Sequence, residues 1–272
     1  MAGSIDNIAI IAKPNSIEAE QAAKRITRLL AHRVLNVYAV NPMTIEDSRA
    51  VEAEDLGKLE LDIVFAIGGD GTTLRAFRYI PRETPLLSVN VGGNRGILSE
   101  IGIASLDESM NAVLLGQYFH ERRIRIQASV GQNEFPAALN DIMVTRVNLT
   151  RTPLLSITLM GDVIEQRMDG IIISTPTGST GHSFSIGGPV LYERLESLLL
   201  SPLAPMNKMP RLVLPPDEIE VRSTHDLSLV VDGQETYPIA AGQPLKISRH
   251  RYDAQFVRIR KRGMRQIVKL GF

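Results

Sequence analysis

The stretch IVFAIGGDGTTLRAF, residues 63–77, decides how the first part of this 272-residue chain folds. An apolar run stops at two glycines, an aspartate follows, and a third glycine precedes a run with helical spacing. Glycines permit positive φ and leave backbone N–H groups exposed, while the N-terminus of the following helix favours anions. The turn therefore predicts a phosphate-binding loop formed by Gly68, Gly69, Gly71 and Thr72.

Asp70 is the unexpected member of this loop. A carboxylate repels phosphate unless it holds Mg²⁺ or accepts a proton from an attacking hydroxyl, so Asp70 is the candidate catalytic residue. The motifs of the two commonest nucleotide-binding loops, G-x-G-x-x-G and G-x-x-x-x-G-K-[ST], cannot be read here. An ordinary strand-to-helix turn is the alternative interpretation. Arg75, one turn into the helix, faces either a phosphate or solvent.

Around this turn, short apolar and β-branched runs alternate with helical or loop segments. The runs are NIAIIAKP from Asn7, VLNVYAV (34–40), DIVFAI (62–67) and TPLLSVNV (84–91). This alternation predicts a parallel sheet in an α/β domain that covers residues 1–103. Asn15 with Glu18 predicts a capping box at the start of the first helix.

The pattern changes after a last helical stretch at residues 106–119. Between residues 124 and 250, many short strand-like runs are separated by Gly, Pro and Asn, and helical periodicity is rare. Short strands separated by turn residues predict a second, mainly β domain over residues 104–249, arranged as a sandwich.

The composition narrows the classes of function. Lys+Arg and Asp+Glu both total 30, so the net charge of zero disfavours nucleic acid and anionic membranes as partners. The absence of Cys excludes disulfides and thiolate metal sites and suits a reducing compartment. No apolar run is long enough for a signal peptide or a membrane span. We therefore expect a cytoplasmic protein without a nucleic-acid or membrane partner.

A second motif, MDGIIISTPTGSTGHSFSIGGPVL at residues 168–191, gathers hydroxyl groups that can line a polar pocket without adding net charge. A surface loop is the alternative, but the apolar run Ile171–Ile173 leads into the motif. The adjacent Asn140 and Asp141 can clamp a ribose diol or a nucleobase edge, although such a pair alone is more often a turn or cap. The hydroxyls belong to Ser174, Thr175, Thr177, Ser179, Thr180 and Ser183.

In this order and spacing, five segments of the chain resemble the NAD kinase family. They are GGDGTTLRA (68–76), SVNVGGNRGILSE (88–100), ALNDIMVTR (138–146), DGIIISTPTGSTGHSFSIGGPVL (169–191) and VVDGQ (230–234). STPTGST is the specific segment, since GGDGT is shared with diacylglycerol kinases and, in shorter form, with phosphofructokinases. The resemblance implies phosphorylation of the 2′-hydroxyl of the adenosine ribose of NAD, giving NADP. It also implies a divalent cation, Mg²⁺, and ATP or polyphosphate as the phosphoryl donor.

The resemblance also implies a fold. We expect an N-terminal Rossmann-like α/β domain, a C-terminal β-sandwich domain, and a segment of about residues 250–272 that packs back on the first domain. The apolar ending IVKLGF (267–272) supports this return, because it would be costly to leave in water. A homodimer or homotetramer is the implied assembly. We interpret the basic residues between 249 and 269 as a solvated face, with an anionic donor or another subunit as the alternative contact.

Individual roles follow from the same resemblance. Asp70 matches the GGDG aspartate, which is either a general base or a metal-linked carboxylate. Mg²⁺ would be held mainly by phosphates, with Asp70 as an additional ligand and without a dedicated protein site. The residues implied to bind NAD are Asn140, Asp141, Asp169, Ser174, Thr177, Thr180, His182, Ser183 and Asp232.

Three features depart from the family's pattern. The acid after Asn is usually Glu, so Asp141 reaches with one methylene less. Where Ala-Tyr commonly follows the second Thr of STPTGST, this chain has Gly181 and His182, and we expect His182 beside the adenine or ribose in place of Tyr. The segment at residues 88–100 is one residue longer than the common pattern.

Two other classes of protein stay open at this point. A noncatalytic dinucleotide sensor would keep the hydroxyl groups and glycines but would not need Asp70. A kinase acting on a lipid or sugar hydroxyl would keep GGDG but would have no use for STPTGST. An assay of NADP formation separates these alternatives.

Overall fold

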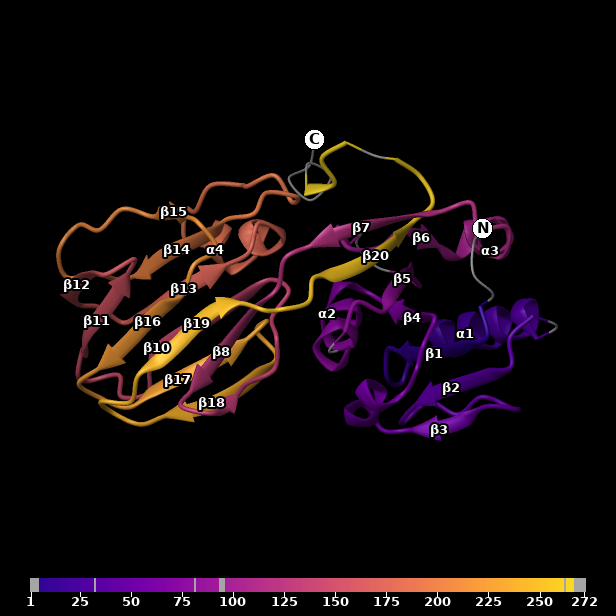
Figure 1. Cartoon of the computed structure of the whole chain (residues 1–272), viewed down its shortest axis with the longest axis horizontal. Coiled ribbons are helices and arrows are strands. Elements are labelled where there is room, and N and C mark those ends of the chain that lie inside the picture. The colour runs from indigo at the N-terminus through magenta and orange to yellow at the C-terminus, as the bar shows by residue number, and fades with distance from the viewer. Residues whose placement is uncertain (1–4, 32, 81, 93–95, 262, 267–272) are drawn as a thin grey trace. The chain divides into compact units, whose positions relative to one another are not determined.

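The chain divides into two compact units (Figure 1). The first contains Met1–Arg122 and Asp253–Phe272, and the second contains Arg123–Tyr252. The first unit is α/β and the second is all-β, as the sequence predicted. The computed structural model describes residues 5–31, 33–80, 82–92, 96–261 and 263–266.

An eight-stranded sheet forms the first unit, in the order β3-β2-β1-β4-β5-β20-β7 and with β6 paired to β5. Each neighbouring pair from β3 to β20 runs parallel. The strands are β1 (Asn7–Ala12), β2 (Asn36–Val40), β3 (Arg49–Val51), β4 (Ile63–Gly68), β5 (Pro85–Asn90), β6 (Ile101–Gly102), β7 (Phe119–Arg123) and β20 (Ala254–Arg258). The helices are α1 (Ile17–Leu30), η1 (Ala53–Lys58), α2 (Asp70–Tyr79), η2 (Ile103–Ser105) and α3 (Leu106–Leu114).

The centre of this sheet explains its apolar sequence. All six residues of β4 are buried, so the strand reads as a continuous apolar run instead of alternating.

Helix α1 is capped by Ser16, whose hydroxyl accepts the Ala19 N–H at 3.2 Å. The predicted capping box of Asn15 and Glu18 is therefore wrong, because Asn15 lies before the cap with φ of 55°. No helix in the described part of the chain combines the length and apolar character of a membrane span.

The boundary between the units lies after Arg122, whereas the sequence analysis placed it near residue 103. Helix α3 buries Leu106 and Met110 in the core of the first unit, and β7 joins the first sheet. The helix also ends earlier than its periodicity suggests, because Gly116 takes a left-handed φ of 67° just beyond its end.

The chain returns to the first unit at Asp253, which confirms the predicted return of the C-terminal segment. Strand β20 lies beside β5 and pairs with it in parallel (Figure 1). Phe256 lies opposite Leu86 in this pairing. The apolar ending that motivated this prediction, residues 267–272, lies outside the described residues.

Two six-stranded sheets form the second unit, in the orders β15-β14-β13-β10-β17-β18 and β12-β11-β16-β19-β8-β9. The strands are β8 (Ile126–Val130), β9 (Asn133–Glu134), β10 (Asp141–Arg146), β11 (Leu154–Leu159), β12 (Asp162–Arg167), β13 (Gly170–Ser174), β14 (Leu198–Leu203), β15 (Leu212–Leu214), β16 (Ile219–Ser223), β17 (Leu227–Val231), β18 (Glu235–Ile239) and β19 (Leu245–Arg249). Two short helical turns follow β13, namely η3 (Thr177–Thr180) and α4 (His182–Ser185).

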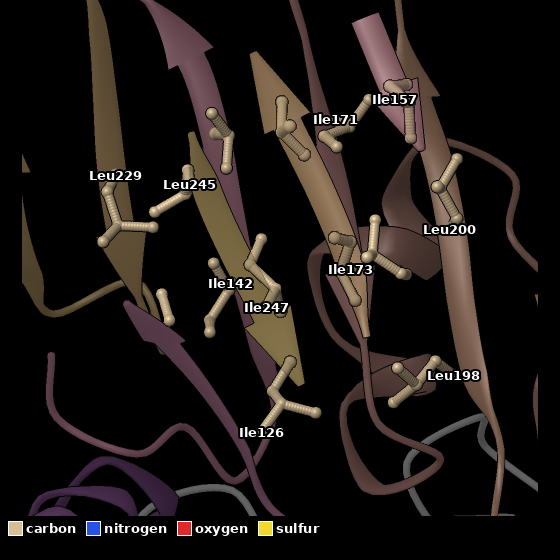
Figure 2. Packing of buried hydrophobic residues seen from close by; sticks show 14 of the residues in the cluster. Ile126, Ile142, Ile157, Ile171, Ile173, Leu198, Leu200, Leu229, Leu245 and Ile247 are labelled. Atoms are coloured by element: carbon tan, nitrogen blue, oxygen red, sulfur yellow. The ribbon is translucent and has the colours of Figure 1, made fainter. Parts of the chain in front are cut away.

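The core of the second unit lies between these sheets. Ile171 and Ile173 of β13 and Ile142 of β10 come from one sheet, and Leu245 and Ile247 of β19 come from the other (Figure 2). All of these side chains are fully buried and belong to one cluster. This apolar core fixes the register that places Asp141 opposite Ser174, since a one-residue slip would turn the core residues outward.

Candidate functional site

The glycine turn begins where β4 ends. Gly69 is the N-cap of α2, with φ of −102°, and Asp70 is the first helical residue. Neither Gly68 nor Gly69 has positive φ, so this part of the predicted reason for the glycines is wrong. Gly68 is required by space instead, because a Cβ there would lie 2.2 Å from the Thr72 hydroxyl oxygen.

Asp70 uses its carboxylate to hold the segment that follows β5. The Ile97 N–H donates to Oδ2 at 3.2 Å, and the Leu98 N–H donates to Oδ1 at 3.1 Å. Gly96 permits this approach, because a Cβ there would lie 2.0 Å from Asp70 Oδ1. The carboxylate therefore joins two loops at the carboxyl end of β4 and β5, which is the edge where ligands of open α/β sheets bind.

Lys13 brings a positive charge to the same edge, and the sequence analysis missed it. The backbone N–H of Lys13 donates to the Ile67 carbonyl at 2.8 Å. The Cβ of Lys13 would lie 3.1 Å from a Cβ added at Gly68. A hollow of about 390 Å³ adjoins it and is lined by residues 12–17, Glu20 and residues 42–44. The position of Lys13, directly after a strand that neighbours β4, was the signal in the sequence.

Arg75 contacts protein at the described position. Its Nη2 donates to the Asn41 carbonyl, which follows β2, at 3.4 Å. The structure thus directs Arg75 towards a neighbouring loop, and its predicted phosphate contact stays a prediction.

In the second unit, Asp232 holds the chain just before β10. Its carboxylate accepts the N–H groups of Leu139, Asn140 and Asp141 at 3.1, 2.7 and 3.2 Å. Asp232 has φ of 51° and is buried. Asp232, a predicted NAD-binding residue, therefore fixes the backbone of the Asn140–Asp141 pair.

The η3 turn packs directly against Asn140. The Thr175 N–H donates to the Asn140 carbonyl at 2.8 Å, and a Cβ on Gly178 would lie 2.0 Å from the same oxygen. A Cβ on Gly181 would lie 3.6 Å from Asp141 Oδ2. Residues 175–181 of the hydroxyl-rich motif thus meet the Asn140–Asp141 pair.

Three polar atoms in this region are buried without a hydrogen-bond partner among the described residues. They are Asn140 Oδ1, Ser174 Oγ and Thr180 Oγ1. Leaving a buried polar group unsatisfied costs about 1–3 kcal/mol, so such groups call for an explanation. A polar ligand or water bound to these atoms would supply it.

Thr177 is held by a buried ion pair that the sequence analysis missed. Arg123 Nη2 lies 3.1 Å from Glu193 Oε1, and its Nη1 donates to the Thr177 hydroxyl at 3.5 Å. Neither partner is more than 3% exposed. Nothing in the spacing of the three residues signalled the contact, because they come from separate segments.

Two predicted NAD-binding residues, Asp169 and Ser183, have protein partners, and a third, His182, is exposed. Asp169 precedes β13, whose far end carries Ser174, and it pairs with Arg146 at 3.0 Å. The Ser183 hydroxyl lies 2.8 Å from the Ser201 hydroxyl, which joins α4 to β14. His182 is exposed at the start of α4.

Within the described residues, no group of three or more acidic or histidine side chains is arranged to hold a metal ion. The carboxylate at the glycine turn is Asp70, and the hydroxyl-rich site of the second unit offers Asp141.

Comparisons with known proteins agree across both units. Residues 8–118 match the family model of the ATP-NAD kinase N-terminal domain, and residues 139–259 match that of the ATP-NAD kinase C-terminal domain. The chain is 34% identical over 261 residues to the NAD kinase of Thermococcus sibiricus, covering 93% of this chain and 94% of that one. It is 33% identical over 273 residues to the NAD kinase of Methanothermobacter thermautotrophicus, covering 96% and 94%.

Two solved structures share the fold. The NAD kinase of Archaeoglobus fulgidus in complex with ATP has a TM-score of 0.77 and 27% identity, covering 97% of both chains. Yeast NADH kinase complexed with NADH has a TM-score of 0.86 and 21% identity, covering 99% of this chain and 87% of that one.

Proposed function

Because the chain belongs to the ATP-NAD kinase family, we propose that it transfers a phosphoryl group from ATP to the 2′-hydroxyl of the adenosine ribose of NAD, giving NADP. It is a phosphotransferase with an alcohol group as acceptor. The observation that carries the assignment of the site is the set of three unsatisfied buried atoms on Asn140, Ser174 and Thr180. Polyphosphate is the alternative donor.

The second unit supplies the groups that bind NAD. Hydroxyl and amide groups satisfy a ribose or an adenine edge without adding charge, and they are already placed, so little ordering entropy is lost on binding. Asp141 accepts a ribose hydroxyl, and Thr177 contacts the dinucleotide from its position beside Arg123. We place His182 beside the adenine or ribose, where its exposed ring is able to stack.

The first unit supplies the chemistry. The Asp70 carboxylate accepts the proton of the ribose 2′-hydroxyl while the hydroxyl oxygen forms a bond to the γ-phosphorus and ADP leaves. Backbone N–H groups at the start of α2 and the Lys13 ammonium offset the charge of the phosphates. Positioning and electrostatics carry most of the catalysis in such transfers.

Three further proposals rest on the family and the composition. A divalent cation, Mg²⁺, would be held mainly by the donor phosphates, whose charge it would neutralise, and a metal-linked carboxylate is the alternative role of Asp70. The protein assembles as a homodimer or homotetramer. It acts in the cytoplasm, in keeping with the absence of Cys.

One assay tests the proposed function against its alternatives. Purified protein is incubated with NAD, Mg²⁺ and ATP, and NADP is measured, with parallel arms that contain polyphosphate, NADH or EDTA. We expect NADP to form with ATP and to disappear with EDTA. A noncatalytic sensor would bind NAD without forming NADP, and a lipid or sugar kinase would do neither.

Substitution of Asp70 by Asn tests the chemical role. The amide keeps the size and one acceptor but removes the negative charge, so we expect kcat to fall by roughly 100-fold or more. NAD binding, measured by calorimetry, should stay within about threefold of wild type. Because the amide NH₂ also faces a backbone donor, thermal unfolding is measured alongside.

Asp62→Asn is the matched control. Asp62 also accepts two backbone N–H groups in the first unit, those of Asp6 and Asn7, each at 2.8 Å. Like Asp70→Asn, Asp62→Asn replaces a charged acceptor of two N–H groups by a neutral one, but away from the glycine turn. Its kcat should stay within about twofold of wild type. A folded Asp70→Asn protein with nearly full activity would show that Asp70 only holds its loop.

A further inference from the structure

The segment that follows β5, residues 96–100, is held from two sides within the first unit. On one side, Asp70 accepts the N–H groups of Ile97 and Leu98. On the other side, Arg258 at the end of β20 donates its Nη1 to the Leu98 carbonyl at 3.0 Å. Leu98 thus binds the proposed catalytic carboxylate through its N–H and the C-terminal strand through its carbonyl.

Glu100 ends this segment in a buried ionic cluster. Its side chain is only 1% exposed, and Arg265 donates to Oε2 at 2.6 Å while Arg258 lies 3.4 Å from the same oxygen. The other oxygen accepts the N–H groups of Ile259 and Arg260 at 3.0 and 3.1 Å. A buried carboxylate is costly unless it is paired and hydrogen-bonded, so each of these contacts helps to keep Glu100 in place.

The arginines of the C-terminal segment are therefore of two kinds. Arg258 and Arg265 are buried, and Arg258 is further balanced by Glu121 at 2.8 Å. Arg260 is exposed and pairs with the exposed Glu108 at 3.2 Å. The interpretation of the basic segment as a solvated face is wrong for the two buried arginines.

We infer that Glu100 and Arg265 are positioning residues for Asp70, an inference that rests on the proposed function. The buried cluster fixes the backbone of residues 97–100, and the N–H groups of that backbone fix the orientation of the Asp70 carboxylate at the glycine turn. Misplacement by about 1 Å from a remote substitution costs up to roughly 100-fold in rate. Glu100 and Arg265 thereby act on the reaction through the placement of Asp70.

Arg265→Met tests this role in the full-length enzyme. The Met side chain keeps much of the length and packing of Arg but removes the charge beside Glu100, while Arg258 remains. We expect kcat to fall about tenfold and the KM for NAD to stay within about twofold. Arg260→Met is the matched control, because it makes the same change at an exposed pair, and it should behave like wild type. Arg265→Met activity within twofold of wild type would overturn the inference.

A double variant separates positioning from general destabilisation. If Arg265 acts through Asp70, Arg265→Met should cost little or no further activity in the Asp70→Asn background. The same tenfold loss in both backgrounds would overturn the inference. Arg265→Lys restores a charge within reach of Glu100 and should recover kcat to within about threefold, and a Lys variant no better than Met would count against it.

Hydrogen exchange of the Leu98 amide reads the position of the segment directly. We expect exchange at least tenfold faster in Arg265→Met than in wild type or Arg260→Met, and unchanged exchange would overturn the inference. If the Met variant does not fold, Arg265→Lys is measured in the same way, with about threefold faster exchange expected. Loss of activity in Asp70→Asn but not in Arg265→Met would defeat only this inference, whereas an active Asp70→Asn would defeat the proposed chemistry itself.

Discussion

Carboxylates that hold backbone N–H groups recur in this protein. Asp70 binds the loop after β5, Asp232 binds the chain before β10, and Asp62 binds the start of β1. Loop N–H groups lack a strand or helix partner, so a side-chain acceptor satisfies them and fixes the loop. The two loops fixed by Asp70 and Asp232 are the ones to which we assign catalysis and NAD binding.

His250 gives the second unit a pH dependence. Burial lowers the pKa of His250 below its ordinary value of 6.5, although the contact with the Tyr252 backbone opposes this shift. The positive charges of Arg125 and Arg251 lower the pKa further, and Glu134 raises it. Between pH 6.5 and the lower pKa of the folded state, the unfolded chain binds more protons. The free energy of unfolding should therefore fall as the pH drops below 6.5 and should not change on this account above it.

Urea unfolding midpoints at pH 7.5 and pH 5.5 measure this effect. His250→Asn keeps an acceptor near the Tyr252 N–H but removes the titrating ring, so its midpoint should change less between the two pH values. His120→Asn, a change at an exposed histidine, should behave like wild type. An undiminished pH dependence in His250→Asn would assign the effect to other groups.

At the scale of elements, the contact between η3 and the chain before β10 shapes the site that we assign to NAD. Gly178→Ala places a Cβ about 2.0 Å from the Asn140 carbonyl oxygen, and backbone cannot yield as a flexible side chain does. We expect the KM for NAD to rise at least tenfold and the free energy of unfolding to fall by about 1–3 kcal/mol. Gly102→Ala is the control, since its Cβ would meet nothing closer than the Asn90 carbonyl oxygen at 4.0 Å. Equal KM values for the two variants would contradict this role of η3.

The same scale shows what the sequence could predict. The parallel strands around β4 were predictable because burial on both faces leaves a continuous apolar run. The helical stretch was predicted as far as Phe119, the first residue of β7, because Tyr118 and Phe119 prolong an apolar pattern that Gly116 interrupts. The buried roles of Arg258 and Arg265 could not be read from a basic run, since pairing with Glu100 depends on contacts made far along the chain.

Within the site, the sequence motifs indicated which residues take part better than they indicated which residues contact one another. Asn140, Asp141 and the 174–180 segment, all predicted to bind NAD, lie together because β10 and β13 pair with Asp141 opposite Ser174. Asp169 was grouped with them because it is close in sequence, but the four residues 170–173 of β13 separate it from Ser174. At about 3.3 Å per residue, closeness in sequence becomes separation in space along a strand.

At the scale of the whole molecule, the first unit is built from two separate stretches of chain. The chain leaves it after Arg122 and returns at Asp253, and β20 then enters the sheet between β5 and β7. The two ends of the second unit lie together, because Arg125 Nε donates to the Tyr252 carbonyl at 3.0 Å and His250 N–H donates to the Arg125 carbonyl at 2.9 Å. The second unit is thus a closed insertion within the first.

Completion of the first unit by β20 should be visible in its stability. Phe256 is fully buried, its ring centre lies 4.7 Å from that of Phe77, and the Arg258 guanidinium lies 4.3 Å above it. Phe256→Ala removes these contacts and leaves a cavity, so we expect the free energy of unfolding to fall by about 3–5 kcal/mol. Urea unfolding followed by circular dichroism measures the change. Phe184→Ala, at a phenylalanine that is 44% exposed, should cost less than about 1 kcal/mol. Equal losses for the two variants would mean that β20 adds little to the first unit.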